Sequence, residues 1–378
     1  MCKYSIYANN LLCNGEWLKN KLVCVENGKV VSVTDYNHED ADYTVKYLTN
    51  ALIDNHIHGG DGFIASSSGE KALIEWLEKL SLNGVGGVAL TLCGSVATIR
   101  SGLEAIKTVM DAQKNGKVKG ALLLGAHLEA PFISRERPGS MPDDAFVSPS
   151  IEEYKAMVKG FEKAVKEITL APELEGADEL IKYLKSNNIK VLAGHSDCGY
   201  DYATKAFKLG VGAICHTFNA IRPIHHREPG VVTAALTNPQ IYCEAICDLE
   251  HLHPGIIKLI MQCKGKNKVM VVSDAVTTTN LPDGEYTVDG EPIVVKDGVS
   301  RHKIHECLDG GGCYISKSVK KLVNIGIPFE DAVVSASVTP ATWLGFNTNE
   351  QVFLQGWNDD FIPQYTFIKN DVYTNKQG

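Results

Sequence analysis

Eight short apolar runs recur through the middle of the chain, and helical patterns separate most of them. Such runs are typical of strands that are buried on both faces of a parallel sheet. The runs are Ala51–Asn55, Gly87–Leu92, Ala121–His127, Ile168–Ala171, Lys190–Ala193, Gly212–His216, Ile241–Ile246 and Lys268–Ser273. Alternation of strands and helices over about 280 residues predicts an α/β protein with a (β/α)8 TIM-like barrel.

Apolar residues spaced at the helical period lie between these runs and predict amphipathic helices. The predicted helices are Lys71–Leu82, Ile99–Met110, Ile151–Val165, Ala177–Leu184, Tyr202–Leu209 and Pro254–Cys263. A doubly wound sheet is the alternative fold, but no Gly-x-Gly-x-x-Gly string follows the first run. A further β excursion is expected at 285–299, after the eighth strand.

The two ends of the chain contain strand-like runs without the helical patterns of the middle. Lys21–Val25 and Lys29–Thr34 flank the turn sequence Glu26-Asn27-Gly28, which predicts a hairpin. The segment Phe361–Lys369 is also strand-like. Because neither end alone would bury a core, we expect residues 1–50 and 345–378 to form one small β-sandwich domain. Residues 51–344 would then form the catalytic barrel between its two parts.

Charge and cysteine content narrow the classes of function. The chain has 37 basic and 45 acidic residues, a net charge of −8, which argues against a nucleic-acid or anionic-membrane surface. No apolar stretch approaches the length of about 18 residues that a membrane span needs. The first residues lack an apolar signal segment, and the 11 cysteines show no paired zinc-finger spacing. We therefore expect a cytoplasmic protein with reduced thiols.

Polar side chains follow five of the eight predicted strands. His56 and His58 share one face at the end of the first strand, because residues i and i+2 of a strand point the same way. Further donors end later strands: Glu129, His195, His216 and Asp274. In a barrel these ends meet at one mouth, where imidazole and carboxylate donors suit Zn²⁺, Fe²⁺, Mn²⁺ or Co²⁺. The sequence thus predicts a metal centre at that mouth.

The longer strings resemble the N-acetylglucosamine-6-phosphate deacetylase family of the amidohydrolase superfamily. The strings are Asp54-Asn55-His56-Ile57-His58-Gly59-Gly60, His127-Leu128-Glu129-Ala130-Pro131, Ala171-Pro172-Glu173, Gly194-His195-Ser196, His216-Thr217-Phe218-Asn219-Ala220, Arg227-Glu228-Pro229-Gly230 and Ser273-Asp274-Ala275. The resemblance covers nearly the whole chain. It implies hydrolytic removal of acetate from an N-acetylated amino-sugar 6-phosphate, with N-acetylglucosamine 6-phosphate as the first candidate.

The resemblance also implies roles for single residues. Glu129, His195 and His216 would hold the principal metal, and His56 and His58 would allow a second ion. One or two divalent ions are expected, with zinc first and iron, manganese or cobalt as alternatives. Asp274 would be the general base and later the acid, while His251 would stabilise the oxyanion or orient the sugar. Asn219, Ala220 and Arg227 would bind the phosphate. A homodimer is expected as well.

Four positions depart from the family pattern. Met141 stands where a substrate-contacting His is usual, Leu249 and Ala130 replace Gly, and Asp309 occupies a loop that usually reads Leu-Ala-Gly-Ser. An intact metal shell with altered substrate loops suggests an altered substrate. The candidates are N-acetylgalactosamine 6-phosphate, another acylated amino sugar or an unphosphorylated one.

Other arginines offer replacement contacts for the phosphate, namely Arg135, Arg137 and Arg222. Two other readings of the chain stay open from sequence. One is a different amidohydrolase that acts on an N-acyl amino acid or a cyclic amide. The other is a non-catalytic metal-binding barrel.

Overall fold

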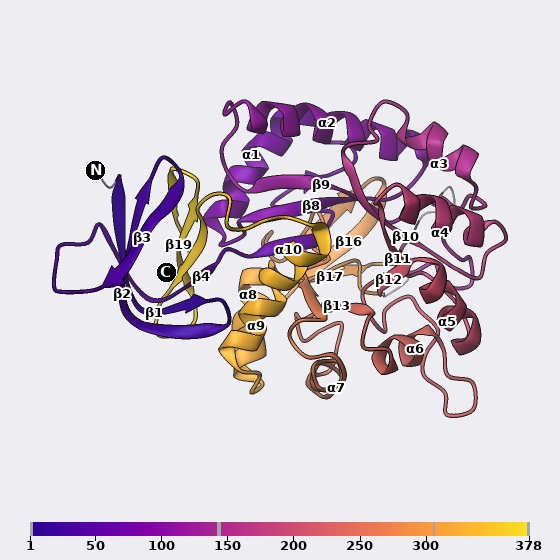
Figure 1. Ribbon diagram of the computed structural model, residues 1–378. Helices are drawn as coiled ribbons and strands as arrows, with labels where there is room; N and C mark the ends of the chain where they lie inside the picture. The colour runs from indigo at the N-terminus through magenta and orange to yellow at the C-terminus, as the bar shows by residue number, and fades with distance from the viewer. Residues whose placement is uncertain (1–2, 142–144, 305–306, 376–378) are drawn as a thin grey trace.

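The two ends of the chain meet in one seven-stranded sheet beside the barrel (Figure 1). The computed structural model describes residues 3–141, 145–304 and 307–375. The sheet runs in the order β20-β19-β18-β4-β1-β2-β3. Its strands are β1 (Tyr4–Cys13), β2 (Glu16–Glu26), β3 (Lys29–Asp35), β4 (Tyr43–Asn50), β18 (Phe353–Trp357), β19 (Pro363–Ile368) and β20 (Asp371–Thr374). β18 pairs antiparallel with β4, which joins the two terminal segments.

The predicted hairpin is confirmed at the turn between β2 and β3. Asn27 and Gly28 adopt positive φ values of 51° and 71° there. Such a turn matches the right-handed twist of the flanking strands, and Asn-Gly supplies it at low steric cost.

Eight parallel strands form the barrel, as the apolar runs predict. They are β5 (Ile53–Ile57), β8 (Gly87–Leu92), β9 (Leu122–Leu128), β10 (Val165–Leu170), β11 (Lys190–Ala193), β12 (Val211–Ile214), β13 (Tyr242–Ile246) and β14 (Val269–Val272). The barrel closes between its last and first strands, where the Asp274 N–H donates to the His56 carbonyl at 2.9 Å. A parallel bridge between Ile57 and Ala275 continues this closure.

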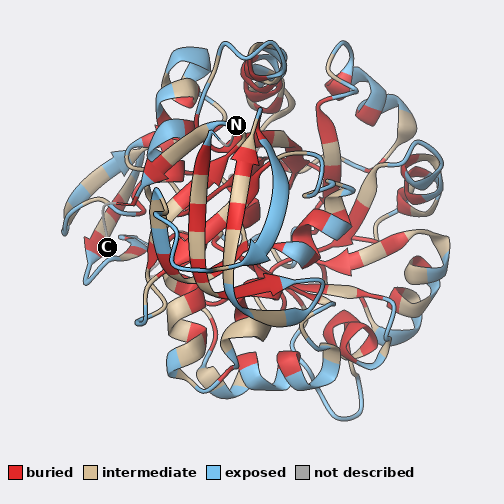
Figure 2. Ribbon diagram, turned by 60° about the vertical axis from the view of Figure 1, so that its left-hand side comes forward, coloured by how far each residue is buried: buried red, intermediate tan, exposed pale blue. Residues whose placement is uncertain are grey.

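Helices surround the strands and cover their outer faces (Figure 1). They are α1 (Gly69–Leu82), α2 (Val96–Lys114), α3 (Ile151–Val158), α4 (Ala177–Ser186), α5 (Tyr200–Leu209), α6 (Val231–Thr237), α7 (Pro254–Lys264), α8 (Ile315–Asn324), α9 (Phe329–Ser335) and α10 (Val338–Leu344). The strands between them are almost entirely buried (Figure 2). The barrel core is one large apolar cluster that extends from Leu52 to Trp357.

Two smaller sheets decorate the barrel. One pairs β6 (Gly59–Gly60) with β7 (Phe63–Ile64). The other contains β15 (Gly284–Val288), β16 (Glu291–Lys296) and β17 (Val299–His302), and it confirms the predicted β excursion after the eighth barrel strand.

The largest differences from the predicted helices are one helix end and four helices that the prediction lacked. The helix predicted over Ile151–Val165 ends at Val158, because Gly160 turns the chain with φ of 88° and Val165 already begins β10. Helices α6, α8, α9 and α10 were not predicted, and three of them (α6, α9 and α10) have only seven residues, too few to establish a helical period.

The cysteines match the sequence expectation with one exception. Nine cysteines of the described ranges are free thiols, whereas Cys24 is disulfide-bonded. None of the helices in the described part of the chain has the length and apolar character of a membrane span.

Candidate metal centre

All six predicted metal-site residues lie at the carboxyl end of the barrel. His56 lies in β5 and His58 just beyond it, and Glu129 directly follows β9. The other three turn sharply after their strands, with φ of 45° at His195, 20° at His216 and 51° at Asp274. Left-handed backbone is unusual for residues other than Gly, and it gathers at functional sites where the surroundings hold it.

Glu129, His195 and His216 form the first cluster. The Glu129 Oε1 atom lies 3.2 Å from His195 Nε2 and 2.9 Å from His216 Nε2. The two Nε2 atoms are 3.1 Å apart. Tetrahedral donors about 2.0–2.1 Å from a zinc ion lie about 3.3 Å from one another, so the spacing fits a divalent cation.

His56, His58 and Asp274 form the second cluster. The Asp274 Oδ1 atom lies 3.4 Å from His56 Nε2 and 3.3 Å from His58 Nε2. Glu129 reaches this cluster too, with Oε1 at 3.3 Å from His56 Nε2 and Oε2 at 3.0 Å from His58 Nε2. The Glu129 carboxylate therefore stands between the two clusters.

The hydrogen bonds of the histidine rings indicate that the Nε2 lone pairs point into the two clusters. His195 Nδ1 lies 3.0 Å from the carbonyl oxygen of Arg137, which can only accept. That nitrogen must donate, so in the neutral ring the lone pair is on Nε2. His56 Nε2 is buried without a hydrogen-bond partner among the described residues. A bound cation would satisfy that nitrogen, so the residues present fit a metal.

The electrostatics agree with a cation-binding cluster. Burial raises the pKa of Glu129, but His56, His58 and the other histidines outweigh it and hold the pKa well below its usual value. Burial raises the pKa of Asp274 as well, and His56 and His58 again reverse the effect. Both carboxyl groups are thus ionised at neutral pH.

A second layer of contacts surrounds His251. Asp248 Oδ2 accepts from His251 Nδ1 at 2.8 Å and from the Gly312 N–H at 3.2 Å. The neighbouring Gly311 N–H donates to the Asp274 carbonyl at 2.7 Å. A Cβ on Gly311 would lie 1.8 Å from the Ser273 carbonyl oxygen, so only Gly fits this close approach. The glycine loop thus joins the Asp274 strand to the His251 loop, and no hydrogen bond among the described residues engages His251 Nε2.

The predicted phosphate residues are only partly gathered. Asn219 and Ala220 lie just beyond His216, and the side-chain Nδ2 of Asn219 is buried without a hydrogen-bond partner among the described residues. Gly139 approaches both Ala220 and His195, so this segment adjoins the first cluster. Arg227 instead lies on an exposed loop, where its Nη1 contacts His226 Nε2 at 2.7 Å.

The replacement arginines have partners of their own. Asp197 accepts from Arg137 Nε at 2.9 Å and from Arg222 Nη2 at 2.6 Å. Glu173 anchors Asp197 in turn, because it accepts the Asp197 N–H at 2.7 Å. Arg135 is exposed and stacks on Phe146, 4.5 Å from the ring centroid.

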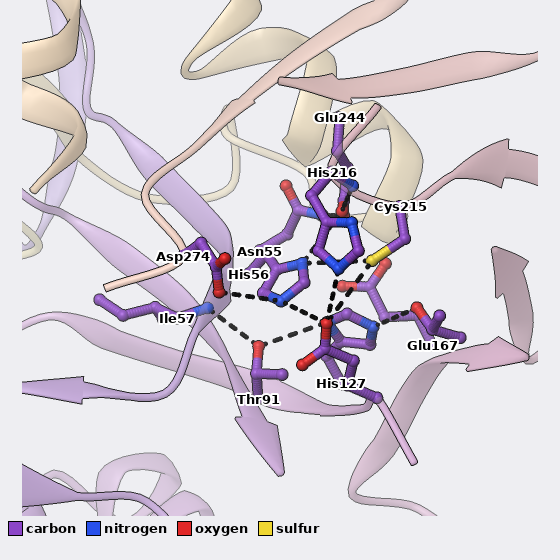
Figure 3. A network of polar contacts seen from close by, with 12 residues as sticks. Asn55, His56, Ile57, Thr91, His127, Glu167, Cys215, His216, Glu244 and Asp274 are labelled. Carbon is purple, nitrogen blue, oxygen red and sulfur yellow. Dashed lines mark hydrogen bonds and ion pairs between the residues drawn. The ribbon is translucent and has the colours of Figure 1, made fainter. Parts of the chain in front are cut away.

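Three buried polar residues of the barrel interior escaped the sequence analysis as site residues. Glu244, Asn55 and Glu167 are all fully buried. Glu244 contacts His56, and Asn55 contacts Glu244 (Figure 3). A charged residue inside the apolar run Ile241–Ile246 was the signal that could have found the first of them.

Comparisons with known proteins agree with this geometry. No family model matches the chain. An N-acetylglucosamine-6-phosphate deacetylase of Vibrio furnissii is 32% identical over 96% of this chain and 93% of its own length. An N-acetylgalactosamine-6-phosphate deacetylase of Escherichia coli O157:H7 is 30% identical over 89% of both chains. The crystal structure of N-acetylglucosamine-6-phosphate deacetylase from Thermotoga maritima superposes with a TM-score of 0.83 at 27% identity, over 98% of both chains.

The fold and the site together define a class of enzyme. A (β/α)8 barrel with histidines and carboxylates at one mouth is that of a metal-dependent amidohydrolase. Given the relative that is 32% identical along nearly its entire length, the chain belongs to the N-acetylglucosamine-6-phosphate deacetylase family.

Proposed function

We propose that the protein hydrolyses the acetamide of an N-acetylated amino-sugar 6-phosphate, with N-acetylglucosamine 6-phosphate as the first candidate. The observation that carries this proposal is the convergence of the first cluster and Asp274 on one mouth. That convergence occurs in a chain 32% identical to an enzyme named for this reaction. The products would be acetate and the free amino sugar.

The first cluster would hold one divalent cation and the second cluster another. A cation at these donors would polarise the amide carbonyl and lower the pKa of a bound water from about 15.7 toward 7. Zinc is our first choice, because imidazole and carboxylate donors about 3 Å apart suit its tetrahedral preference.

Asp274 would move the proton. Its carboxylate is ionised and half-buried at the mouth, so it accepts a proton from the attacking water at Oδ1 or Oδ2. The same oxygen then returns the proton to the leaving nitrogen. His251, whose Nδ1 is held by Asp248, would direct Nε2 to the carbonyl oxygen or to the sugar.

Asn219 and Ala220 would contact the phosphate, together with Arg227. The Asn219 Nδ2 group supports this role, since it is a buried donor without a partner among the described residues. An arginine fork matches a phosphate group in geometry and charge.

One observation favours a second candidate, a different or unphosphorylated hexosamine. Asp309 is half-buried, and burial and the charge of Asp274 raise its pKa. Its carboxyl group is therefore within electrostatic reach of the base, where it would repel a phosphate. N-acetylgalactosamine 6-phosphate is the first such alternative, because a relative named for that substrate is 30% identical.

We also propose a homodimer and a cytoplasmic location. The nine free thiols among the described residues favour a reducing compartment. Size-exclusion chromatography with light scattering would test the dimer, and a mass equal to one chain would rule it out.

A substrate panel tests the proposed activity. The purified protein, loaded with Zn²⁺, is given N-acetylglucosamine and N-acetylgalactosamine, each with and without the 6-phosphate, and acetate is measured. We expect acetate from the phosphorylated sugars, fastest with N-acetylglucosamine 6-phosphate. Faster acetate release from the unphosphorylated sugars would favour the second candidate. No acetate from any of the four sugars would refute the proposal.

A further inference from the structure

Glu244 lies in β13, fully buried behind the metal centre (Figure 3). Its Oε1 accepts from Asn55 Nδ2 at 2.7 Å. Its Oε2 accepts from the His216 N–H at 3.2 Å and lies 3.0 Å from His56 Nδ1. One carboxyl group therefore contacts the strand end of the first cluster and a ring of the second.

These contacts fix the tautomer of His56. A side-chain amide nitrogen and a backbone N–H can only donate, so both oxygens of Glu244 serve as acceptors. With both oxygens already accepting hydrogen bonds, Glu244 acts as an acceptor toward His56 Nδ1 as well, and that nitrogen donates to it. The lone pair of the neutral ring is then on Nε2. That atom lies 3.3 Å from Glu129 Oε1 and 3.4 Å from Asp274 Oδ1.

A second acid is buried in the barrel interior. Glu167 in β10 is also fully buried, and burial together with the charge of Glu244 raises its pKa to about 8. The indole N–H of Trp343 donates to it. At neutral pH Glu167 is accordingly protonated, and none of its hydrogen bonds among the described residues reaches His56.

We propose that Glu244 is a positioning residue that commits His56 to metal binding through Nε2 and so sets the affinity of the second cluster. The inference rests on the proposed metal-dependent function and adds a residue to it. The side chain meets the first cluster only at the backbone N–H of His216. Changes at Glu244 should therefore weaken the second ion far more than the first.

Metal binding, measured apart from turnover, tests this inference. Metal-free protein is titrated with Zn²⁺ by calorimetry, and bound metal per chain is measured by mass spectrometry. We expect two ions per wild-type chain. Glu244→Gln keeps the size of the side chain but replaces one acceptor oxygen by an NH2 donor, and it should raise the Kd of the second ion by about 10–100-fold. The Kd of the first ion should stay within about twofold.

Glu167→Gln is the matched control. It makes the same chemical change at an equally buried site, and it replaces a group that is already neutral at pH 7. Both Kd values should stay at the wild-type level in this variant. An equal rise of the second Kd in both variants would show a general effect of changes in the barrel interior and would overturn the proposal.

Other outcomes are equally decisive. An unchanged second Kd in Glu244→Gln, or a single ion in the wild type, overturns the proposal. If Glu244→Gln does not fold, Asn55→Ala removes one donor to Glu244 and decides the matter. A raised second Kd in that variant supports the proposal, and an unchanged one refutes it. Absence of acetate release with the expected Kd pattern would instead reject only the proposed substrate reaction.

Discussion

Asp248 should contribute a measurable and pH-dependent part of the stability of the barrel. Its side chain is 1% exposed. Burial raises its pKa, but hydrogen bonds from His251 and Glu250 outweigh burial and lower the pKa from 3.8 to about 2. A difference of about 1.8 pKa units corresponds to about 2.5 kcal/mol of unfolding free energy.

The sign of the pH dependence follows from the lowered pKa. The stabilisation is fully present above the pKa of the unfolded chain and is lost as the pH falls toward the folded value. Between pH 6 and pH 3 about 1 kcal/mol of this stabilisation should be lost, and the remainder should be lost below pH 3. Asp248→Asn has no charge to lose, so its own stability should change less over that range.

Urea unfolding of both proteins at pH 6, 5, 4 and 3, followed by tryptophan fluorescence, measures the effect. We expect Asp248→Asn to be less stable by about 2.5 kcal/mol at pH 6 and the gap to narrow by about 1 kcal/mol at pH 3. Asp40→Asn changes an exposed carboxylate and serves as the control. A gap of constant size from pH 6 to pH 3 would refute the reasoning.

Three further predictions concern the site. Asp274→Asn should lower the acetate release rate about 10²–10⁴-fold while the first-cluster ion stays bound, and near-normal turnover would contradict its role as base. Gly311→Ala should lower the melting temperature and the turnover, because its Cβ would lie 1.8 Å from the Ser273 carbonyl oxygen. The control Gly199→Ala, where a Cβ has open space, should change neither quantity. Removal of metal with a chelator should lower the free energy of unfolding by about 2.7 kcal/mol, compared with protein kept at a metal concentration of 100 times the Kd. An unchanged melting temperature would argue against a bound ion.

The barrel was predictable because its strands are buried on both faces. That burial leaves continuous apolar runs, and their polar ends mark the mouth. The candidate ligands were found by the same logic, since parallel strands in a barrel all end on one side. The roles of these residues stay a prediction, as do the domain limits 1–50, 51–344 and 345–378.

The barrel interior could not be predicted in the same way. Glu244 lies inside the run Ile241–Ile246, and Glu167 lies in β10 just before the run Ile168–Ala171. The sequence does not say whether either side chain points into the barrel or toward the helices. Nor does the strand pattern disclose that His195, His216 and Asp274 adopt positive φ. The Leu249 departure gains a physical meaning only from the structure: its φ of 66° is a conformation that Gly adopts without strain.

The distribution of charge around the mouth constrains how a phosphorylated sugar could lie there. Arg137 and Arg222 both pair with the carboxylate of Asp197, and Glu173 accepts the Asp197 N–H, so two arginines and two acids meet at this corner. The Arg137 carbonyl also holds His195, which places the corner beside the first cluster. Asp309 lies in the loop whose Gly311 N–H donates to the Asp274 carbonyl, and its carboxyl group interacts electrostatically with Asp274. Since charges within a Debye length of about 8–10 Å still interact, a phosphate should face away from Asp309 and toward Asn219, whose Nδ2 is a buried donor without a partner among the described residues. In that orientation Asp309 would accept hydrogen bonds from the sugar hydroxyls, and its charge would disfavour a phosphate only on its own side of the sugar.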